Sequence, residues 1–220
     1  MPGAHRVIAI DGPAASGKSS VARELARQIG FAYVNSGEMY RAATWFVLRQ
    51  NVPTNDAKKI AALIDRVELR CDLAKGESRI FIDGADPTSF LRDDAVNDAV
   101  SAVSSVPRIR ERLVEQMRAY ALDHDVVMEG RDIGSVVFRD TPFKFYIDAS
   151  PAVRAQRRQA QGQRDQIAAR DRADSSRRVS PLVRSDDADV IDSSSLSIDE
   201  VVREIIRSLK AKGFENLALA

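Results

Sequence analysis

The sequence predicts an α/β fold in which a parallel sheet is flanked by helices. Short apolar runs typical of buried strands alternate with segments whose apolar residues recur at helical spacing. Parallel strands need long crossover connections, and helices usually provide them, so the alternation itself favours a parallel sheet. The chain has 220 residues, of which 44% are hydrophobic. This is enough for one sizeable core, as a single domain or as a domain with an insertion.

The apolar runs and the capping signals place the individual elements. Strands are predicted at Val7–Ile10, Phe31–Val34, Val126–Glu129, Phe143–Ile147 and Val190–Ile191. Helices are expected where start signals precede an apolar face. Such signals are found at Ser19–Gly30, at the segment beginning with Pro107, at Ser150–Arg158, and at the last helix, where Ser197 and Glu200 form a capping box. Gly30 is expected to end its helix in the left-handed conformation.

One stretch departs from this alternation. From about Asp65 to Phe90, apolar residues recur at every second position on either side of a turn at Gly76. A helix from about Asp93 to Val103 leads back to the main pattern. We therefore expect a small antiparallel β insertion. Ligands of open parallel sheets bind beyond the carboxyl ends of the strands, where such an insertion could cover a second substrate.

Composition limits the class of protein. The formal net charge of +1 gives no general attraction to nucleic acid or to an anionic membrane, so neither is expected as a partner. The one cysteine, Cys71, is expected in the core, and the lack of an intrachain disulfide fits a reducing cytoplasm. We expect no signal peptide, no membrane span and no structural metal. Balanced charge and the absence of a long apolar stripe favour a monomer.

Residues 12–19 match every fixed position of the phosphate-binding loop pattern G-x-x-x-x-G-K-[ST]. The match lies between a predicted strand and a predicted helix, which is the context that the loop requires. Backbone N–H groups and the positive end of the helix dipole would then face a polyphosphate. Lys18 is expected to reach the β- and γ-phosphates, and the Ser19 hydroxyl is expected to face Mg²⁺. The sequence thus predicts a P-loop NTPase-type parallel sheet.

Arginine dominates a segment in the last third of the chain. Between residues 154 and 178 there are eight arginines, three aspartates and no lysine. Arg170, Asp174 and Arg177 would share one helical face. The planar fork of arginine suits phosphate, so residues from about 159 to 178 are predicted to form an arginine-rich lid over the transferring phosphates. A solvated charged helix is the alternative interpretation.

Polar residues also follow two predicted strands. Residues 129–132, Glu-Gly-Arg-Asp, come after a central apolar run, and residues 35–37, Asn-Ser-Gly, precede Tyr40 and Arg41. At the carboxyl ends of parallel strands these residues would meet in the ligand crevice. The alternatives are a surface turn for the first segment and a simple N-cap by Ser36 for the second.

With these segments, the chain resembles the bacterial cytidylate kinases of the nucleoside-monophosphate kinase superfamily over essentially its whole length. The resemblance rests on Ile10-Asp11-Gly12-Pro13, Ser36-Gly37 with Tyr40-Arg41, Pro107-Arg108-Ile109-Arg110, Gly130-Arg131-Asp132-Ile133-Gly134, Ala155-Gln156-Arg157-Arg158, Arg170-Asp171 with Asp174-Ser175 and Arg177, Pro181-Leu182, and residues 189–194. It implies one nucleoside-monophosphate kinase domain over residues 1–220. Within that domain, residues 1–60 and 105–220 would form the core, about 61–104 the CMP-binding insertion, and about 159–178 the lid.

The resemblance implies transfer of the γ-phosphoryl group of ATP to CMP or dCMP, with Mg²⁺, in cytoplasmic pyrimidine metabolism. ATP would be held by Gly12, Pro13, Ala14, Ala15, Ser16, Gly17, Lys18, Ser19 and Ser20, with Arg154, Arg157 and Arg158 on the donor or lid side. The cytosine-side residues would be Ser36, Arg110 and Asp132, and the sugar-side residues Ser101, Arg170 and Asp174. The acceptor phosphate would be surrounded by Arg41, Arg131 and Arg177, near Gly37, Tyr40 and Gly130. The catalytic set implied is Lys18, Arg131, Asp132, Arg170 and Arg177.

One residue departs from the family pattern, and two other classes of protein compete with this interpretation. Asn35 stands where the family usually has aspartate, which removes a charge near the acceptor site or the metal. A kinase for another small molecule, such as another nucleotide or shikimate, shares the phosphate-binding loop. A GTPase-type switch would need the strings [NT]-K-x-D and D-x-x-G, and neither occurs.

Overall fold

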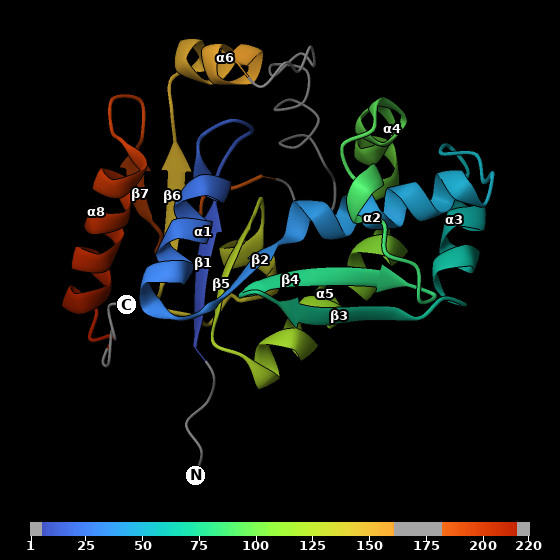
Figure 1. Cartoon of the computed structure of the whole chain (residues 1–220), viewed down its shortest axis with the longest axis horizontal. Coiled ribbons are helices and arrows are strands. Elements are labelled where there is room, and N and C mark those ends of the chain that lie inside the picture. Colours follow the sequence, from blue (N-terminus) through green and yellow to red (C-terminus); the bar gives the residue numbers. More distant parts are fainter. Residues whose placement is uncertain (1–5, 161–181, 215–220) are drawn as a thin grey trace.

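A seven-stranded sheet runs through the described part of the chain, residues 6–160 and 182–214 of a computed structural model (Figure 1). The strand order is β3-β4-β2-β5-β1-β6-β7. All neighbours are parallel except β3, which is antiparallel to β4. The strands are β1 (Val7–Asp11), β2 (Ala32–Asn35), β3 (Leu69–Ala74), β4 (Glu77–Ile82), β5 (Val126–Gly130), β6 (Lys144–Asp148) and β7 (Asp189–Asp192). The five strands predicted from apolar runs are confirmed, with ends shifted by at most one residue.

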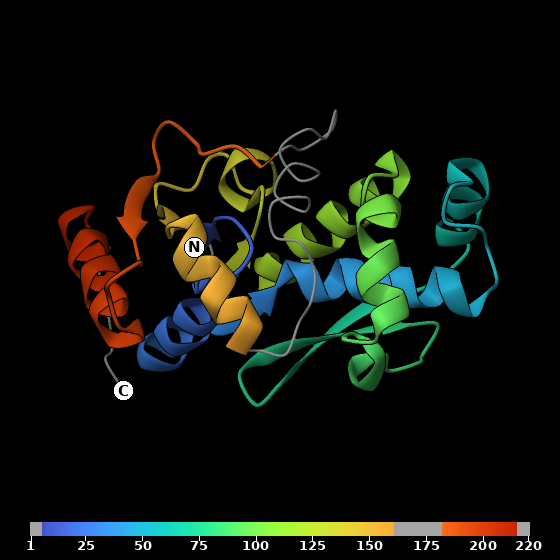
Figure 2. The same cartoon turned by 90° about the horizontal axis from the view of Figure 1, so that it is seen from above.

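Helices cover both faces of this sheet. Two helices lie between β2 and the hairpin, and two more lie between the hairpin and β5. The α-helices in the described residues are α1 (Lys18–Ile29), α2 (Ser36–Arg49), α3 (Ala57–Ile64), α4 (Asp94–Ser104), α5 (Pro107–Asp123), α6 (Pro151–Ala160) and α8 (Ile198–Ala211). A short 3₁₀ helix, η1 (Thr88–Phe90), and a π-helical turn, η2 (Ile133–Val137), complete the elements. Helices α1 and α8 pack together in one hydrophobic cluster, and α2 to α5 form the other (Figure 2).

The period-two stretch forms the predicted hairpin. Lys75 and Gly76 connect β3 to β4, and both have positive φ, 54° and 80°. This is the combination that a two-residue type I′ turn requires. Strand β4 joins the main sheet parallel to β2, with Glu77 opposite Tyr33. Because Asn35 ends β2 only two residues later, the hairpin extends the sheet beyond the carboxyl end of β2.

The connection from β1 to α1 has the backbone that the loop motif predicts. Gly12 has a φ of 153°, and a Cβ added there would lie 2.1 Å from the carbonyl oxygen of Ile147. No other residue fits without moving β6 away from β1. Helix α1 ends at Gly30, which has a φ of 71°, so the predicted left-handed cap is confirmed. Within the residues that the structure describes, no helix combines the length and apolar character needed to cross a membrane.

Candidate active site

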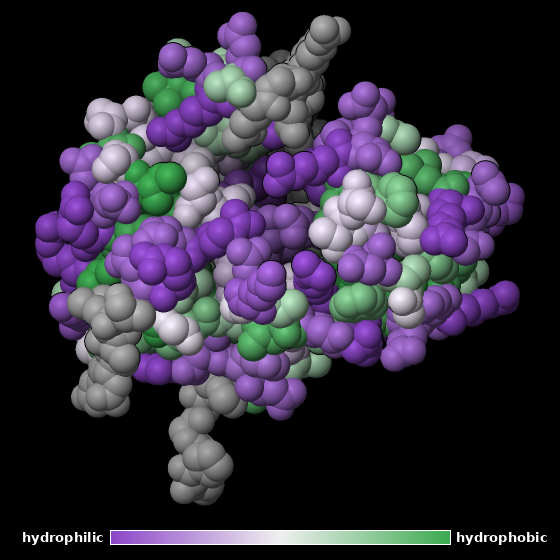
Figure 3. Space-filling view, viewed as in Figure 1, coloured by the Kyte–Doolittle hydropathy of each residue, from purple (hydrophilic) through white to green (hydrophobic). Residues whose placement is uncertain are grey.

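A cavity of about 380 Å³ opens at the carboxyl ends of β1, β2 and β5. Figure 3 shows hydrophilic side chains around a hollow at this level of the molecule. Residues from the loop after β1, from α1, α2 and α4, and from the end of β5 line the cavity. Those that the sequence predicted are Ala14, Ala15, Lys18, Ser19, Ser20, Ser36, Gly37, Tyr40, Arg41, Ser101, Arg110, Gly130, Arg131, Asp132 and Arg158.

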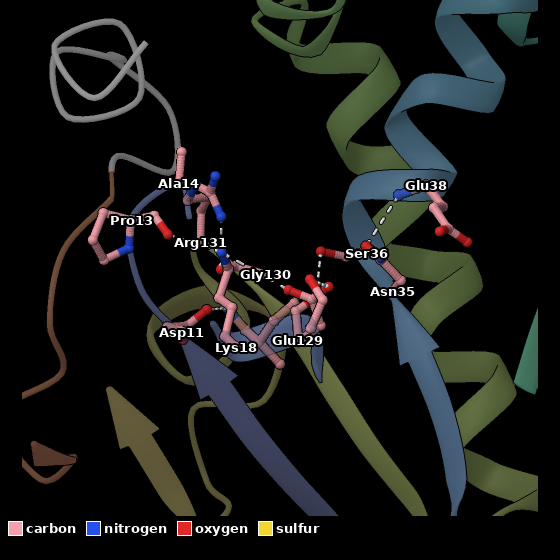
Figure 4. Close-up of polar contacts among 12 residues, drawn as sticks. Asp11, Pro13, Ala14, Lys18, Asn35, Ser36, Glu38, Glu129, Gly130 and Arg131 are labelled. Carbon is pink, nitrogen blue, oxygen red and sulfur yellow. Dashed lines mark hydrogen bonds and ion pairs between the residues drawn. The ribbon is translucent and has the colours of Figure 1, made fainter. Parts of the chain in front are cut away.

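Lys18 is buried at the centre of the phosphate-binding loop, with 5% of its surface exposed. Its Nζ donates a hydrogen bond to the carbonyl oxygen of Pro13 at 3.0 Å and lies 4.0 Å from Glu129 Oε2 (Figure 4). An ammonium group is costly to bury without partners, and these two oxygens supply them. The loop therefore holds the Lys18 ammonium group at the cavity through contacts with Pro13 and Glu129.

Glu129 belongs to the segment that the sequence placed in the ligand crevice, but no individual role was predicted for it. It lies near the end of β5, with 3% of its surface exposed. Its Oε1 accepts hydrogen bonds from Ser19 Oγ at 2.6 Å and from Tyr33 Oη at 3.3 Å. Burial and the nearby Glu129 carboxylate raise the pKa of Tyr33 above its ordinary value. The sequence signal was an acidic residue at the end of an apolar strand, but only the pairing of β5 with β1 places it beside the loop.

The start of α2 corrects one alternative interpretation. Asn35, not Ser36, is the N-cap, because Asn35 Oδ1 accepts from the backbone N–H of Glu38 at 3.2 Å. Asparagine and aspartate cap helices about equally well, so this role tolerates the departure at position 35. The Ser36 hydroxyl instead donates to the carbonyl oxygen of Glu129 at 2.8 Å. A Cβ at Gly130 would lie 2.4 Å from Ser36 Oγ and 2.8 Å from the side chain of Ile133, so glycine leaves room for both side chains at the end of β5.

Arg110 and Asp132 form a buried ion pair on the cavity wall. Arg110 Nη2 donates to Asp132 Oδ2, and the two side chains are each 3% exposed. Arg110 Nη1 donates to the carbonyl oxygen of Ser104 at 3.3 Å, and the guanidinium lies over the ring of Tyr40, 4.9 Å from its centroid. Within the part of the chain that the structure describes, the buried Nε atom of Arg110 has no hydrogen-bond partner. A buried donor without a partner is costly, which makes it a feature that a ligand would satisfy.

A second carboxylate, Asp11, fixes the turn that carries Asp132. Its two oxygens accept from the backbone N–H groups of Ile133 and Gly134, each at 2.8 Å. Burial raises the pKa of Asp11 to about 6, and nearby Asp132 adds to the rise, while these two hydrogen bonds and Lys18 oppose it. Asp11, the residue directly before the loop, therefore fixes the turn that follows Asp132.

The other predicted residues lie in different places: Gly12, Pro13, Ser16 and Gly17 belong to the loop but do not line this cavity. Arg41 donates from Nη1 to the carbonyl oxygen of Leu91 at 3.0 Å and to Asn97 Oδ1 at 2.6 Å, so it ties α2 to the start of α4 while lining the cavity. Arg157 does not line this cavity, although Arg158 does. Arg170, Asp174 and Arg177 lie outside the described residues, as does most of the predicted lid.

The site offers one pair of groups that suits a magnesium ion. Among the described residues, no group of three or more His, Cys, Asp or Glu side chains could hold a metal by itself. Mg²⁺, however, is usually bound through one or two carboxylates together with substrate phosphates. Ser19 Oγ and Glu129 Oε1, which are 2.6 Å apart at the mouth of the loop, match that donor set.

The carboxyl ends of the strands thus carry a phosphate-binding loop on one side of the cavity and a buried polar pocket on the other. This arrangement defines a P-loop kinase, in which one nucleotide places its phosphates on the loop and an acceptor lies opposite.

The comparisons with known proteins identify the family. The cytidylate kinase family model matches residues 8–211. The chain is 44% identical over 217 residues to a cytidylate kinase of Pelotomaculum thermopropionicum, covering 93% of this chain and 96% of that protein. It is also 44% identical over 213 residues to a cytidylate kinase of Symbiobacterium thermophilum, covering 91% and 94%. The chain belongs to the cytidylate kinase family, and the resemblance seen in the sequence is confirmed.

One relative carries this unit within a longer protein. A bifunctional pantoate ligase/cytidylate kinase of Synechococcus sp. is 42% identical over 219 residues, which cover 93% of this chain but 41% of that protein.

Proposed function

We propose that the chain transfers the γ-phosphoryl group of ATP to CMP and dCMP, giving ADP with CDP or dCDP. The observation that carries the choice of acceptor is the buried Arg110–Asp132 pair on the cavity wall. Cytosine presents an amino donor beside ring and carbonyl acceptors. A carboxylate can accept from the amino group while a guanidinium donates to the acceptors. Uracil presents a carbonyl where cytosine has the amino group, so Asp132 would face an oxygen and disfavour it.

On the donor side, the loop would bind the ATP phosphates through its backbone N–H groups. Lys18 would exchange its bond to the Pro13 carbonyl for one to the β- and γ-phosphates, because a phosphate oxygen is the stronger partner for an ammonium group. Ser19 and Glu129 would hold Mg²⁺. When bound, the ion supplies positive charge to the phosphates.

On the acceptor side, an oxygen of the monophosphate would attack the γ-phosphorus in line with the departing ADP. The bond to the bridging oxygen breaks as the new P–O bond forms. Little proton transfer is needed, so the protein acts by positioning and by neutralising charge. Arg131 and Arg41, which both line the cavity, are proposed to face the acceptor phosphate. Ser36 and Ser101 are proposed to contact the base and the sugar.

The predicted lid would complete the site. Arg170 and Asp174 are proposed to bind the sugar, and Arg177 the transferring phosphate. Asp174→Ala should then impair CMP more than an acceptor that lacks the sugar hydroxyl, and Arg177→Ala should act mainly on kcat. Steady-state kinetics with matched acceptors would test both. Equal losses for all acceptors would favour the solvated charged helix.

A coupled assay of ADP release tests the proposal as a whole. CMP, dCMP, UMP, AMP and shikimate would be compared as acceptors at saturating ATP and Mg²⁺. We expect the highest kcat/KM for CMP and dCMP. A preference for AMP or shikimate would show that the enzyme is a kinase for another acceptor. ATP hydrolysis that is independent of any acceptor would contradict the kinase reaction.

A further inference from the structure

Arg157 contacts another part of the protein instead of the nucleotide cavity. It projects from α6, and its Nη1 and Nη2 donate to the hydroxyl and the carbonyl oxygen of Ser193, at 3.1 and 2.7 Å. Ser193 is the residue after β7, with 3% of its surface exposed. The fork of one arginine thus holds both oxygens of a single buried serine.

Ser193 in turn contacts the phosphate-binding loop. Its hydroxyl donates to the carbonyl oxygen of Ser16 at 2.7 Å. Three residues earlier on α6, Arg154 donates from Nη1 to the carbonyl oxygen of Ala14 at 3.3 Å. Two carbonyl groups of the loop are therefore bound from the side of α6 and the β7–α8 connection. Neither Arg157 nor Ser193 lines the cavity.

The direction of these carbonyl groups matters for anion binding. A loop binds phosphate when its N–H groups converge on the anion, and a carbonyl oxygen turned inward would repel it. Each carbonyl that has a donor outside the loop is held away from the phosphate. The adjacent residue, Gly17, is the N-cap of α1 and has a φ of 92°, so the orientation of the Ser16–Gly17 peptide determines where the first N–H groups point.

We propose that Ser193 is a positioning residue for ATP, and that Arg157 acts on the loop through Ser193 instead of contacting the nucleotide. The proposal rests on ATP occupying the loop, as in the proposed function. It changes the role that the resemblance implied for Arg157. Helix α6 contains the first residues of the arginine-rich segment, and through Arg154 and Arg157 it therefore connects that segment to the donor loop.

The next residue in the chain provides a matched control. Ser194 also makes two hydrogen bonds through its hydroxyl: it donates to Asp192 Oδ1 at 2.5 Å and accepts from the N–H of Ser150 at 2.8 Å. These partners lie at the ends of β7 and α6 and not in the loop. Ser193→Ala and Ser194→Ala each remove one hydroxyl and two hydrogen bonds, but only the first removes a contact with the loop.

The experiment compares the two alanine variants in the full-length enzyme. For Ser193→Ala we expect the KM for ATP to rise about tenfold, with less than a twofold change in the KM for CMP. For Ser194→Ala we expect both constants within twofold of the parent. Calorimetric binding of ATP without acceptor should show the same difference. Equal effects of the two substitutions, or a Ser193→Ala effect on CMP as large as on ATP, would overturn the proposal.

Arg157 variants separate positioning from direct contact. If Arg157 acts through Ser193, Arg157→Ala combined with Ser193→Ala should weaken ATP binding no more than the larger single change. Arg157→Lys keeps the charge but loses the planar fork, so it should behave like Arg157→Ala. If the two substitutions weaken ATP binding by factors that multiply, or if Arg157→Lys binds ATP as well as the parent, Arg157 instead contacts the phosphates directly. Parent turnover of CMP tests the proposed function separately, because ATP binding can be measured without it.

Discussion

The donor side and the acceptor side of the cavity are built in opposite ways. The donor loop is one uninterrupted run, residues 12–20, which we propose binds phosphate mainly through its backbone N–H groups. The acceptor pocket gathers Ser36 from α2, Ser101 from α4, Arg110 from α5 and Asp132 from the turn after β5. A contiguous loop carries its geometry in its own dihedral angles, whereas a dispersed pocket depends on the order of the strands.

This difference predicts how each side responds to substitution. On the donor side, truncating a loop side chain should leave the backbone N–H groups in place, so the largest losses are expected at Lys18 and at Ser19, whose side chains are themselves proposed to bind the phosphates and the ion. On the acceptor side, the side chains themselves are proposed to read the substrate, so substitutions there should change specificity. Between the two, Asp11 and Glu129 connect loop and pocket through hydrogen bonds.

The largest expected effect belongs to Lys18. Lys18→Ala should lower kcat by about 10³-fold, or about 4 kcal/mol of transition-state stabilisation, because it removes the buried charge that faces the phosphates. Rapid-quench or coupled kinetics would measure it, with thermal unfolding as the check on folding. Near-normal turnover by a folded variant would show that the backbone N–H groups alone carry the donor side.

The second effect is one of specificity. Arg110→Met should lower kcat/KM for CMP by a factor that corresponds to about 2–4 kcal/mol of lost transition-state stabilisation. It removes the proposed partner of the base and leaves Asp132 buried without its counter-charge. UMP and AMP should lose less. Arg108→Met is the control: Arg108 lies on the same helix but pairs with exposed Asp65 and Glu111 at the surface. If all acceptors lose the same factor, the pair supports the fold and does not read the base.

The third effect concerns the connection between the two sides. The folded pKa of Asp11, about 6, lies above its ordinary value of 3.8. Between these pH values the folded state holds the proton more tightly, so stability falls as pH rises from about 4 to 6 and then levels off. The loss of unfolding free energy should approach about 3 kcal/mol, because the pKa of Asp11 is raised by roughly two units on folding and each unit corresponds to about 1.4 kcal/mol. Urea unfolding of the parent and of Asp11→Asn across this range would isolate the contribution, and identical pH profiles would contradict it.

The smallest effect belongs to an exposed contact. Arg23 on α1 pairs with Glu77 at the start of β4 at 2.8 Å, which links the donor helix to the hairpin. Both side chains are more than two-fifths exposed. A double-mutant cycle with Arg23→Ala and Glu77→Ala should give a coupling energy of at most about 1 kcal/mol. A coupling of several kcal/mol would mean that this pair restrains the hairpin relative to the loop.

Most of the fold could be predicted because its signals are local. The five apolar strands, the Gly30 cap and the turn at Gly76 each depend on a few neighbouring residues. The capping box of Ser197 and Glu200 is present as predicted. Interpretation was less successful where two residues compete for one role, as at Asn35 and Ser36. There the choice of cap depends on whether the neighbouring hydroxyl finds a partner on β5.

The sequence alone determined the phosphate-binding loop, its flanking strand and helix, and the hairpin, because backbone dihedral preferences and short-range hydrogen bonds act within a few residues. The family followed from motifs distributed along the chain. Tertiary structure alone decided that β5 lies between β2 and β1, which brings Glu129 to Ser19. It also decided that Arg157 reaches Ser193. Such contacts join residues far apart in the chain, and the packing of the whole sheet and its helices determines which of them form.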